Sequence, residues 1–439
     1  MPSFKLGKVH LPHRKNTADM KAVRMSAPAS VLIPTAQHIG APAAVTVKPG
    51  DKVYVGTLIG EAQGYVSSPI HSSVSGVVKK IETFLQSSGR KCDAVLIESD
   101  GEMTLDPSIA PPTVTSFDEL SAAVRASGLV GLGGAGVPTA VKLDAQKKGI
   151  IKKVIINGAE CEPYITSDTR TMLDDVDYIV KGIELIKKYV SCDEIIFGIE
   201  KNKKACIELL KKKFENDALV RVDTLPDTYP QGAEKILIYN TTGLVVPEGA
   251  LPADVGCIVM NVTSLAFMAK YVETGIPLVE KCLTVDGSAI KNPMNVIAPI
   301  GTSVEDIINF TGGYSDEAGK VLYGGPMMGI AMYSTSDPIF KNTNAIVALN
   351  KKDAAPKTQR ACIHCGRCVS ACPMGLNPTA FARALKVEDS AERRDRLMAD
   401  KINLCIECGC CSFVCPSSRP LVENNRLAKA DVRNLQQKK

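Results

Sequence analysis

The sequence predicts a multidomain protein of mixed α/β and α+β class. An all-β N-terminal unit, a central α/β layer, a small β-grasp-like module and a mostly helical C-terminal unit follow one another along the chain. Three observations support this prediction. The 439 residues correspond to about two to four domains, the spacing of apolar residues changes along the chain, and many of the 15 Cys gather near the C-terminus. We place the domains at residues 1–110, 115–252, 253–335 and 350–439.

The N-terminal unit shows short alternating apolar segments between Ala27 and Ser99, separated by Pro-Gly, Gly and Ser clusters. This pattern is typical of an all-β domain. The phrases KPGDKVYVGTLIG and SPIHSSVSGVV resemble the barrel-sandwich hybrid of biotinyl and lipoyl carrier domains. The Met-Lys-Met type turn that carries the modified Lys in that family does not occur here, so we expect a structural role for this domain.

The spacing of apolar residues changes after this unit. Ser116 to Glu119 form a capping box that opens a helix, and helices then alternate with short β runs to about Pro252. This alternation predicts an α/β layer with a mainly parallel sheet. From Gly275 to Gly325, two short strands and a helix starting near Ser303 fit a β-grasp module of the SLBB kind.

The C-terminal unit contains two copies of one Cys motif, offset by 43 residues (405 minus 362). Each copy reads C-x2-C-x2-C-x3-C-P, the spacing of bacterial two-cluster ferredoxins, in which the fourth Cys ligates the other cluster. Zinc sites prefer pairs of ligands at longer separation. We therefore predict two [4Fe-4S] clusters. The first takes Cys362, Cys365, Cys368 and Cys415, and the second takes Cys405, Cys408, Cys411 and Cys372.

The residues around these motifs allow two interpretations. His364 and Arg367 lie between ligands and either tune the cluster potential or face solvent as loop residues. Cys410 is out of register, and we expect it to be a neighbour of the second cluster and not a ligand. The remaining cysteines are isolated and are expected to be small core residues: Cys92, Cys161, Cys192, Cys206, Cys257 and Cys282.

A glycine-rich loop in the central unit is the second candidate site. Gly131, Gly133, Gly134 and Gly136 match G-x-G-x-x-G. A capped helix precedes them instead of the strand that the dinucleotide fingerprint requires, so the ordinary Rossmann interpretation fails. The loop is either a tight packing turn or a phosphate-binding loop at the start of the next helix, where Lys142 would lie beside a bound anion.

Composition excludes some classes of protein. The net charge is +5 from 52 basic and 47 acidic residues, which shows no nucleic-acid footprint. The longest uncharged apolar stretch, residues 255–269, contains polar residues and is too short to span a bilayer. The N-terminus has no apolar region of the kind found in secretory signals. We therefore expect a cytoplasmic protein, in which clustered Cys are more often metal ligands than disulfides.

The segments GLGGAGVPTAVKL, VIINGAECEPYITSDTR, QGAEKILIYN and IVMNVTSL resemble the flavin-binding subunit of respiratory NADH dehydrogenases, which carries FMN and receives hydride from NADH. With the opening GKVHLPHRK, the later YGGPMMG and the twin Cys motif, nearly the full chain resembles RnfC, the C subunit of the Rnf complex. That complex is a membrane-bound NAD:ferredoxin oxidoreductase coupled to Na⁺ or H⁺ translocation.

The resemblance implies roles for particular residues. It places the four loop glycines and Lys142 around the FMN phosphate and ribityl chain, and Asn157, Glu160 and Glu162 near the isoalloxazine and nicotinamide. Glu234 falls at the nucleotide site and Asn261 at the flavin. Four positions depart from the family pattern: Leu132 replaces an Arg, Val137 a Phe, Ala159 an Asp and Ala233 a Glu. NADH recognition is therefore the part of the resemblance that this sequence supports least.

The implied function is hydride exchange between NADH and FMN, followed by single-electron transfer through the two clusters, or the reverse when ferredoxin is the donor. Glu160 and Glu162 would orient the nicotinamide or steady charge at the flavin. The implied partners are integral membrane subunits, a ferredoxin-like subunit, ferredoxin and NADH, with no nucleic acid. The implied location is peripheral, on the cytoplasmic face of the cell (inner) membrane.

Two other functions remain open. The cobalamin-reducing flavoprotein of diol-utilisation microcompartments resembles the same family in its flavin and cluster domains, whereas the VHLPHRK opening favours Rnf. A non-enzymatic electron-transfer subunit without flavin is the alternative from another class, and Ala159 and Ala233 are the features that favour it.

Overall fold

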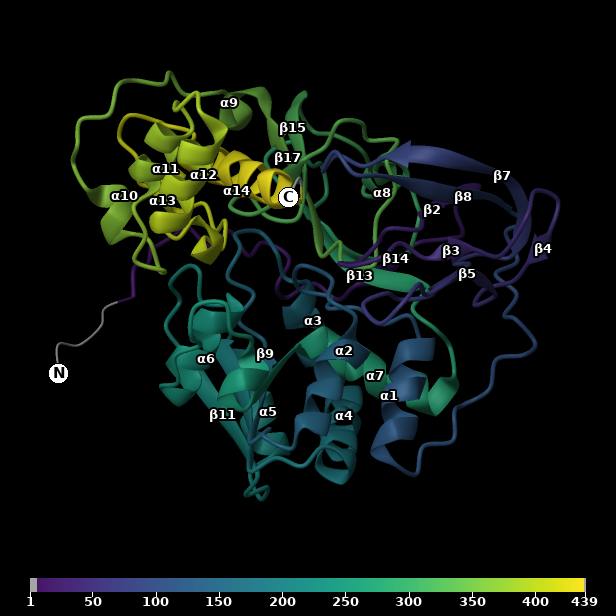
Figure 1. The fold of residues 1–439 in the computed structure, drawn as a ribbon. Coiled ribbons are helices and arrows are strands. Elements are labelled where there is room, and N and C mark those ends of the chain that lie inside the picture. Colours follow the sequence, from purple (N-terminus) through teal and green to yellow (C-terminus); the bar gives the residue numbers. More distant parts are fainter. Residues whose placement is uncertain (1–5, 438–439) are drawn as a thin grey trace.

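The computed structural model describes residues 6–437. The N-terminal unit consists of two antiparallel sheets around one core (Figure 1). The first sheet has the strand order β2 (Ser30–Pro34), β8 (Lys91–Ser99), β7 (Gly76–Leu85), β4 (Lys52–Val53), and the second has the order β3 (Ala44–Val45), β5 (Leu58–Glu61), β6 (Ile70–His71). Val31, Ile59 and Ile97 meet between the sheets and are almost completely buried. Alternation of apolar and polar residues in this segment thus produces the predicted sandwich.

The central unit contains a parallel sheet with the strand order β11 (Val220–Leu225), β10 (Glu194–Glu200), β9 (Lys153–Asn157), β12 (Cys257–Asn261). The first of these strands along the chain, β9, lies between the second and the fourth. The chain adds β10 and β11 on one side of β9 and then adds β12 on the other side, which makes the gap between β9 and β12 a topological switch point. Open α/β sheets bind ligands at such a point, at the carboxyl ends of the strands.

Helices cover both faces of this sheet (Figure 1). Their bounds are α1 (Phe117–Ala126), α2 (Thr139–Leu143), α3 (Ser167–Asp174), α4 (Val176–Tyr189), α5 (Lys204–Lys213), α6 (Glu234–Thr242) and α7 (Val262–Thr274). The predicted capping box at Ser116 and Glu119 is confirmed, since each side chain accepts a hydrogen bond from the other residue's backbone amide. Short 3-10 helices lie at η1 (Asp144–Lys148) and η2 (Pro252–Val255).

The third unit is a six-stranded sheet with α8 (Val304–Phe310) packed against it. Its strand order is β1 (Val23–Arg24), β14 (Met294–Pro299), β13 (Glu280–Asp286), β17 (Ala345–Asn350), β15 (Ala318–Tyr323), β16 (Ile330–Ala331).

The strand pairing differs from the predicted boundaries 115–252 and 253–335. The buried run of β12 completes the parallel sheet, and α7 packs on α4, so residues 257–274 belong to the central unit. The third sheet also includes two strands that lie outside the predicted range 253–335, namely β1 and β17. Short segments acquire their sheet partners from distant sequence, which local spacing does not reveal.

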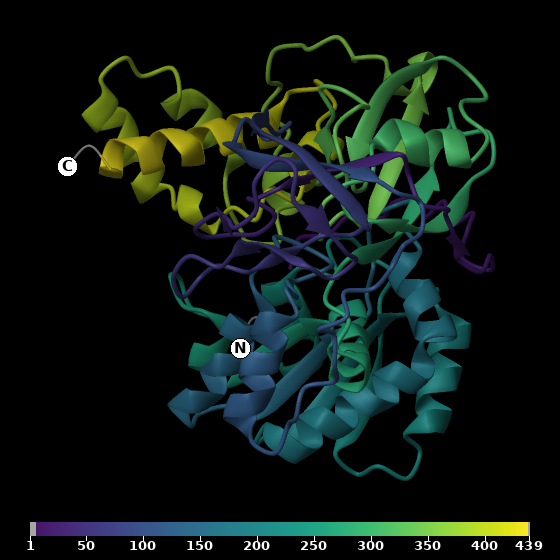
Figure 2. The same ribbon diagram turned by 90° about the vertical axis from the view of Figure 1, so that its right-hand side faces the viewer.

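The C-terminal unit is helical, as predicted, and lies across the third sheet from the N-terminal sandwich, above the central unit in Figure 1. Figure 2 shows α14 extending from this unit toward the C-terminus. Its elements are α9 (Lys351–Ala354), α10 (Arg367–Ser370), α11 (Pro378–Ala384), α12 (Ser390–Ala399), η3 (Ile402–Leu404), α13 (Cys410–Phe413) and α14 (Leu421–Gln437). Within residues 6–437 no helix has the length and apolar character needed to cross a membrane.

Candidate functional site

The glycine-rich loop lies beside the switch point. A Cβ atom at Gly133 would stand 2.5 Å from the Asn261 amide nitrogen, so a larger residue does not fit there. Leu132 is buried in the apolar core, and its amide donates to the Ser264 hydroxyl at 3.1 Å. The position that departs from the family's Arg thus serves packing. The backbone at Gly133 therefore lies directly against the Asn261 side chain at the end of β12.

Two other units hold this loop. The Asn342 side-chain amide, from the segment before β17, donates to the Gly134 carbonyl at 3.0 Å, and the Ile39 amide of the N-terminal unit donates to the Gly136 carbonyl at 3.3 Å. Gly136 has φ of 70°, a left-handed conformation that favours glycine. The loop conformation therefore depends on contacts from three parts of the chain.

Lys142 and Glu234 form an ion pair at the same end of the sheet. The Lys142 ammonium lies 2.8 Å from the Glu234 carboxylate and donates to the Val259 carbonyl at 3.1 Å. The two side chains are 28% and 39% exposed. The pair is half-buried and remains open to solvent, so a bound anion can reach the lysine and compete with Glu234 for it.

Asn157 and Asn261 occupy matching positions at the ends of β9 and β12. The Asn157 amide donates to the Gly232 carbonyl at 2.9 Å. Asn261 caps α7 through its side-chain oxygen and donates to the Asp168 carboxylate at 2.8 Å. The sequence prediction missed Asp168, which is 6% exposed. Asp168 lies in the first turn of α3, where an acidic side chain is favourable for the helix dipole, but the sequence analysis predicted no helix that begins at this point.

The two predicted catalytic carboxylates lie in the loop after β9 and already accept backbone hydrogen bonds. Glu160 caps α3, accepting from the Asp168 amide at 2.6 Å and from the Thr169 hydroxyl at 2.6 Å. Glu162 accepts from the amides of Met327 and Met328 at 3.0 and 2.7 Å. Burial raises the pKa of the Glu162 carboxyl, and the two amides oppose that shift. Both side chains thus hold neighbouring segments in place.

The four cysteines predicted for the first cluster line one cavity of about 200 Å³. Three of them come from the first motif copy and Cys415 comes from the second. Arg419 lines the same cavity, and its buried Nε has no hydrogen-bond partner among residues 6–437. A buried donor beside four thiols suits an anionic iron–sulfur cluster.

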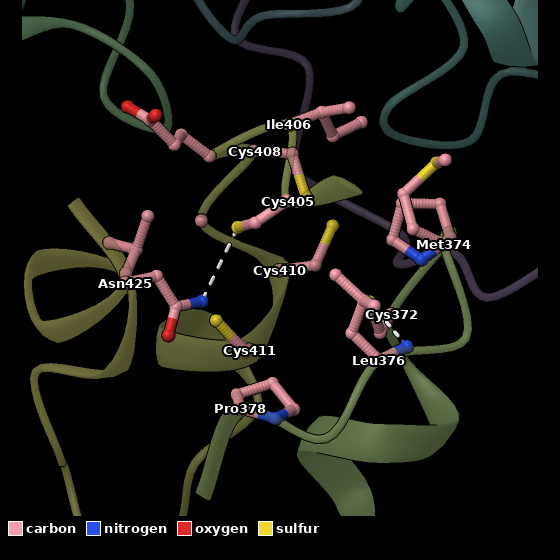
Figure 3. Close-up of a pocket in the computed structure, with 14 residues that line it drawn as sticks. Cys372, Met374, Leu376, Pro378, Cys405, Ile406, Cys408, Cys410, Cys411 and Asn425 are labelled. Atoms are coloured by element: carbon pink, nitrogen blue, oxygen red, sulfur yellow. Dashed lines mark hydrogen bonds between the residues drawn. The ribbon is translucent and has the colours of Figure 1, made fainter. Parts of the chain in front are cut away.

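The four cysteines predicted for the second cluster line another cavity, of about 20 Å³, together with Cys410 (Figure 3). The Leu376 amide donates to the Cys372 sulfur at 3.3 Å, and the Asn425 side chain donates to the Cys405 sulfur at 3.4 Å. Hydrogen bonds to sulfur tune cluster potentials. In the part of the chain that the structure describes, no three Cys, His, Asp or Glu side chains are arranged to hold a single metal ion.

A short series of contacts connects the loop after β9 with the second cavity. Glu162 binds the Met327 amide, and the Met327 carbonyl lies so close to Gly409 that a Cβ atom there would be 2.7 Å from it. Tyr229 is 2% exposed, and its hydroxyl donates to the Cys408 carbonyl at 2.8 Å. The carboxyl ends of the parallel sheet thus adjoin one of the two cysteine cavities.

Comparison with known families agrees with this geometry. The Nuo51 FMN-binding domain matches residues 124–270, the RnfC barrel sandwich hybrid domain 3–102, the SLBB domain 283–331 and the 4Fe-4S dicluster domain 358–419. The C subunit of the Na⁺-translocating ferredoxin:NAD⁺ oxidoreductase complex of Acetobacterium woodii is 44% identical over 380 residues, which cover 86% of each chain. The chain belongs to the RnfC family.

A second relative of the RnfC family supports the same assignment. The C subunit of the proton-translocating ferredoxin:NAD⁺ oxidoreductase complex of Clostridium ljungdahlii is 42% identical, covering 87% of this chain and 84% of that one. Among solved structures, the NAD⁺-reducing [NiFe]-hydrogenase in its H₂-reduced state has a TM-score of 0.51 at 17% identity, over 72% of this chain and 63% of that chain. The latter likeness is one of fold.

These comparisons confirm the predicted family and the fold class. FMN and [4Fe-4S] clusters are the cofactors of this RnfC family member, which is an electron-transferring oxidoreductase. The residues that hold each cofactor remain predictions. Sequence reasoning did not find four residues that contact the predicted site residues: Asp168, Tyr229, Asn425 and the half-buried Lys15.

Proposed function

We propose that this chain exchanges electrons between NADH and two [4Fe-4S] clusters within a membrane-bound, ion-translocating ferredoxin:NAD⁺ oxidoreductase. The observation that carries the proposal is the contact series Glu162, Met327, Gly409. It joins a ligand-binding edge of an α/β sheet to one of two cysteine cavities. A flavin domain and a cluster domain in contact are what this reaction needs, because a nicotinamide exchanges two electrons and each cluster exchanges one.

The residues at the switch point fit FMN. The glycine-rich loop would receive the FMN phosphate and ribityl chain through Gly131, Gly133, Gly134 and Gly136. Lys142 would supply the positive charge beside the phosphate. When bound, FMN exchanges hydride with a nicotinamide and electrons with the clusters. Asn261, fixed by Asp168, would present its amide to the flavin.

The loop after β9 would orient the nicotinamide. Asn157 is held at the strand end by the Gly232 carbonyl, while Glu160 keeps α3 in place. Glu162, held by the two Met amides, would steady charge at the reacting groups, and Glu234 would lie at the nucleotide site. The geometry favours positioning over proton transfer for both carboxylates of the loop, because their oxygens accept backbone hydrogen bonds.

The two cysteine cavities would hold the clusters with ligands exchanged between the motif copies. The first takes Cys362, Cys365, Cys368 and Cys415, and the second takes Cys405, Cys408, Cys411 and Cys372. Cys410 lines the second cavity as a neighbour. Donors from Leu376, Asn425 and Arg419 would offset the negative charge of thiolate-bound clusters.

For partners, we propose integral membrane subunits, a ferredoxin-like subunit and ferredoxin, with the chain on the cytoplasmic face of the membrane. The names of the relatives support a multi-subunit, ion-translocating assembly. The exposed Cys365 places the first cavity at the surface, where a partner's redox centre can approach.

The test is cofactor analysis and NADH titration of the anaerobically purified full-length chain. We expect FMN in the supernatant after denaturation, iron for two clusters, and bleaching of the cluster absorbance by NADH. Clusters without FMN would contradict this function and favour a flavin-free electron-transfer subunit. If the purified protein reduces cobalamin with NADH but does not reduce ferredoxin, that result would favour the cobalamin-reducing alternative.

A further inference from the structure

Lys15 lies in the N-terminal arm, residues 7–17, and its ammonium group is bound entirely to one loop of the central unit. Its Nζ donates to the carbonyl oxygens of Glu160 at 2.7 Å, Glu162 at 2.8 Å and Ile165 at 2.6 Å. An ammonium has three donors and no acceptor. All of its hydrogen-bonding capacity is therefore used on the loop that follows β9, about 150 residues further along the chain.

This loop needs external support. Glu160 and Tyr164 have φ of 49° and 72°, in the left-handed region that residues with a side chain rarely adopt. Such conformations persist where surrounding contacts determine them, and they occur often at functional sites. Lys203 adds a hydrogen bond to the Ala159 carbonyl at 2.7 Å. The half-buried Lys15 and the buried Lys203 thus bind four carbonyl groups of one short segment.

The charge at Lys15 is costly to bury, which argues against an incidental position. Burial lowers the pKa of the Lys15 ammonium to about 8, with Lys203 acting in the same direction and Glu160 and Glu200 opposing it. Taking a charge out of water without partners is strongly unfavourable. The three carbonyls and the nearby carboxylates provide the compensation.

The arm is anchored on both sides of Lys15. Val9 and Tyr229 exchange backbone hydrogen bonds of 2.9 Å in each direction, and the Tyr164 amide donates to the His13 carbonyl at 3.0 Å. The Thr17 hydroxyl lies 2.5 Å from that of Thr166. Lys15 is therefore delivered to the loop by a segment with a fixed path.

We propose that Lys15 is a positioning residue of the nicotinamide site, which fixes the backbone of residues 158–165 so that Glu162 keeps its orientation. The inference rests on the proposed function, because it assigns Lys15 to the loop that would orient the nicotinamide. Lys15 itself acts through its hydrogen bonds to backbone carbonyls and takes no part in the chemistry.

The experiment compares the full-length holoprotein with Lys15→Met, Lys15→Arg and a control, Lys21→Met, which removes an exposed lysine. NADH oxidation with ferricyanide as acceptor gives KM and kcat. For Lys15→Met we expect KM for NADH to rise about ten- to a hundredfold because the loop is released. We expect kcat to stay within about twofold, with FMN and iron content unchanged. Lys15→Arg should recover part of the loss, and Lys21→Met should match the wild type.

Hydrogen–deuterium exchange supplies a second measurement. In Lys15→Met the amides of residues 158–165 should exchange faster while β10 and β12 exchange as in the wild type. If Lys15→Met does not fold, Lys15→Arg carries the test. Its planar guanidinium does not reproduce the geometry of the three ammonium hydrogen bonds, so a smaller increase in exchange over residues 158–165 is expected. Unchanged KM and unchanged loop exchange would overturn the inference. A wild type that does not oxidise NADH would refute the proposed function instead, and the exchange experiment would still test Lys15.

Discussion

The two cysteine cavities have the same ligand pattern and very different surroundings. The second cavity is enclosed by the N-terminal arm, where a Cβ atom at Gly7 would be 2.4 Å from the Cys372 carbonyl, and by the buried Tyr229. The first cavity opens to the surface at Cys365, and the adjacent Ile363 is 65% exposed. Two motifs with the same Cys spacing thus fold into one site that adjoins the flavin domain and one that faces outward.

This difference has a physical consequence for electron transfer. Reduction potentials of iron–sulfur clusters depend on hydrogen bonds to sulfur, local charge and solvent exposure. The second cavity receives donors from Leu376 and Asn425, whereas the first has solvent and Arg419. We therefore expect two clusters with separate potentials, the second exchanging electrons with the flavin domain and the first with a partner protein.

The largest effect should come from removing a ligand of the enclosed site. Cys411→Ser is expected to lower bound iron by about half, because four thiolates hold each cluster, and to stop NADH-dependent reduction of ferredoxin. Iron and acid-labile sulfide assays measure the first effect, and an acceptor assay measures the second. Cys410→Ser is the matched control in the same cavity. Equal iron loss in the control would make Cys410 a ligand and contradict the assignment.

Iron chelation should separate the two sites. Because Cys365 is exposed while Cys408 and Cys411 are each 7% exposed, a chelator should remove iron in two phases, the faster one from the first cavity. Absorbance during treatment with a chelator under oxygen-free conditions gives the phases. Cys365→Ser should lack the fast phase. A single phase in the wild type, with both clusters lost together, would show that exposure does not distinguish the cavities.

The sequence predicted which cysteines share a cavity more completely than it predicted the surroundings that make the two cavities differ. Within each motif, three of the four predicted ligands are close in the chain, and their spacing is a local pattern that the sequence displays directly. Lys15 and Glu160 lie 145 residues apart, and Tyr229 and Cys408 lie 179 apart. Such pairs depend on tertiary packing, which leaves no local pattern. The same holds for β12, whose apolar run gives no indication that it pairs with β9.

Hydrogen bonding to sulfur should make a smaller contribution. Asn425→Ala removes the donor to Cys405 and is expected to lower the midpoint potential of the second cluster by roughly tens of millivolts, because such hydrogen bonds stabilise the reduced, more negative state. Redox titration monitored by electron paramagnetic resonance measures both clusters in one sample. Asn424→Ala, on the adjacent residue, controls for changes in α14. A shift confined to the first cluster would reverse our assignment of the two potentials.

The smallest effect should come from the tyrosine that joins the two domains. Tyr229→Phe keeps the buried ring and removes one hydrogen bond to the Cys408 carbonyl. The free energy of unfolding should fall by about 0.5–1.5 kcal/mol, plus the cost of leaving that carbonyl without its partner. Thermal unfolding of the cluster-loaded protein gives the value, with Tyr333→Phe as the control because Tyr333 is 93% exposed.

If the hydrogen bond from Tyr229 also holds the second cavity against the central unit, Tyr229→Phe should speed the slow phase of iron chelation and leave the fast phase unchanged. Equal acceleration of both phases would show instead that the hydroxyl stabilises the C-terminal unit as a whole, and the contrast between an enclosed and an open site would then lose its structural basis.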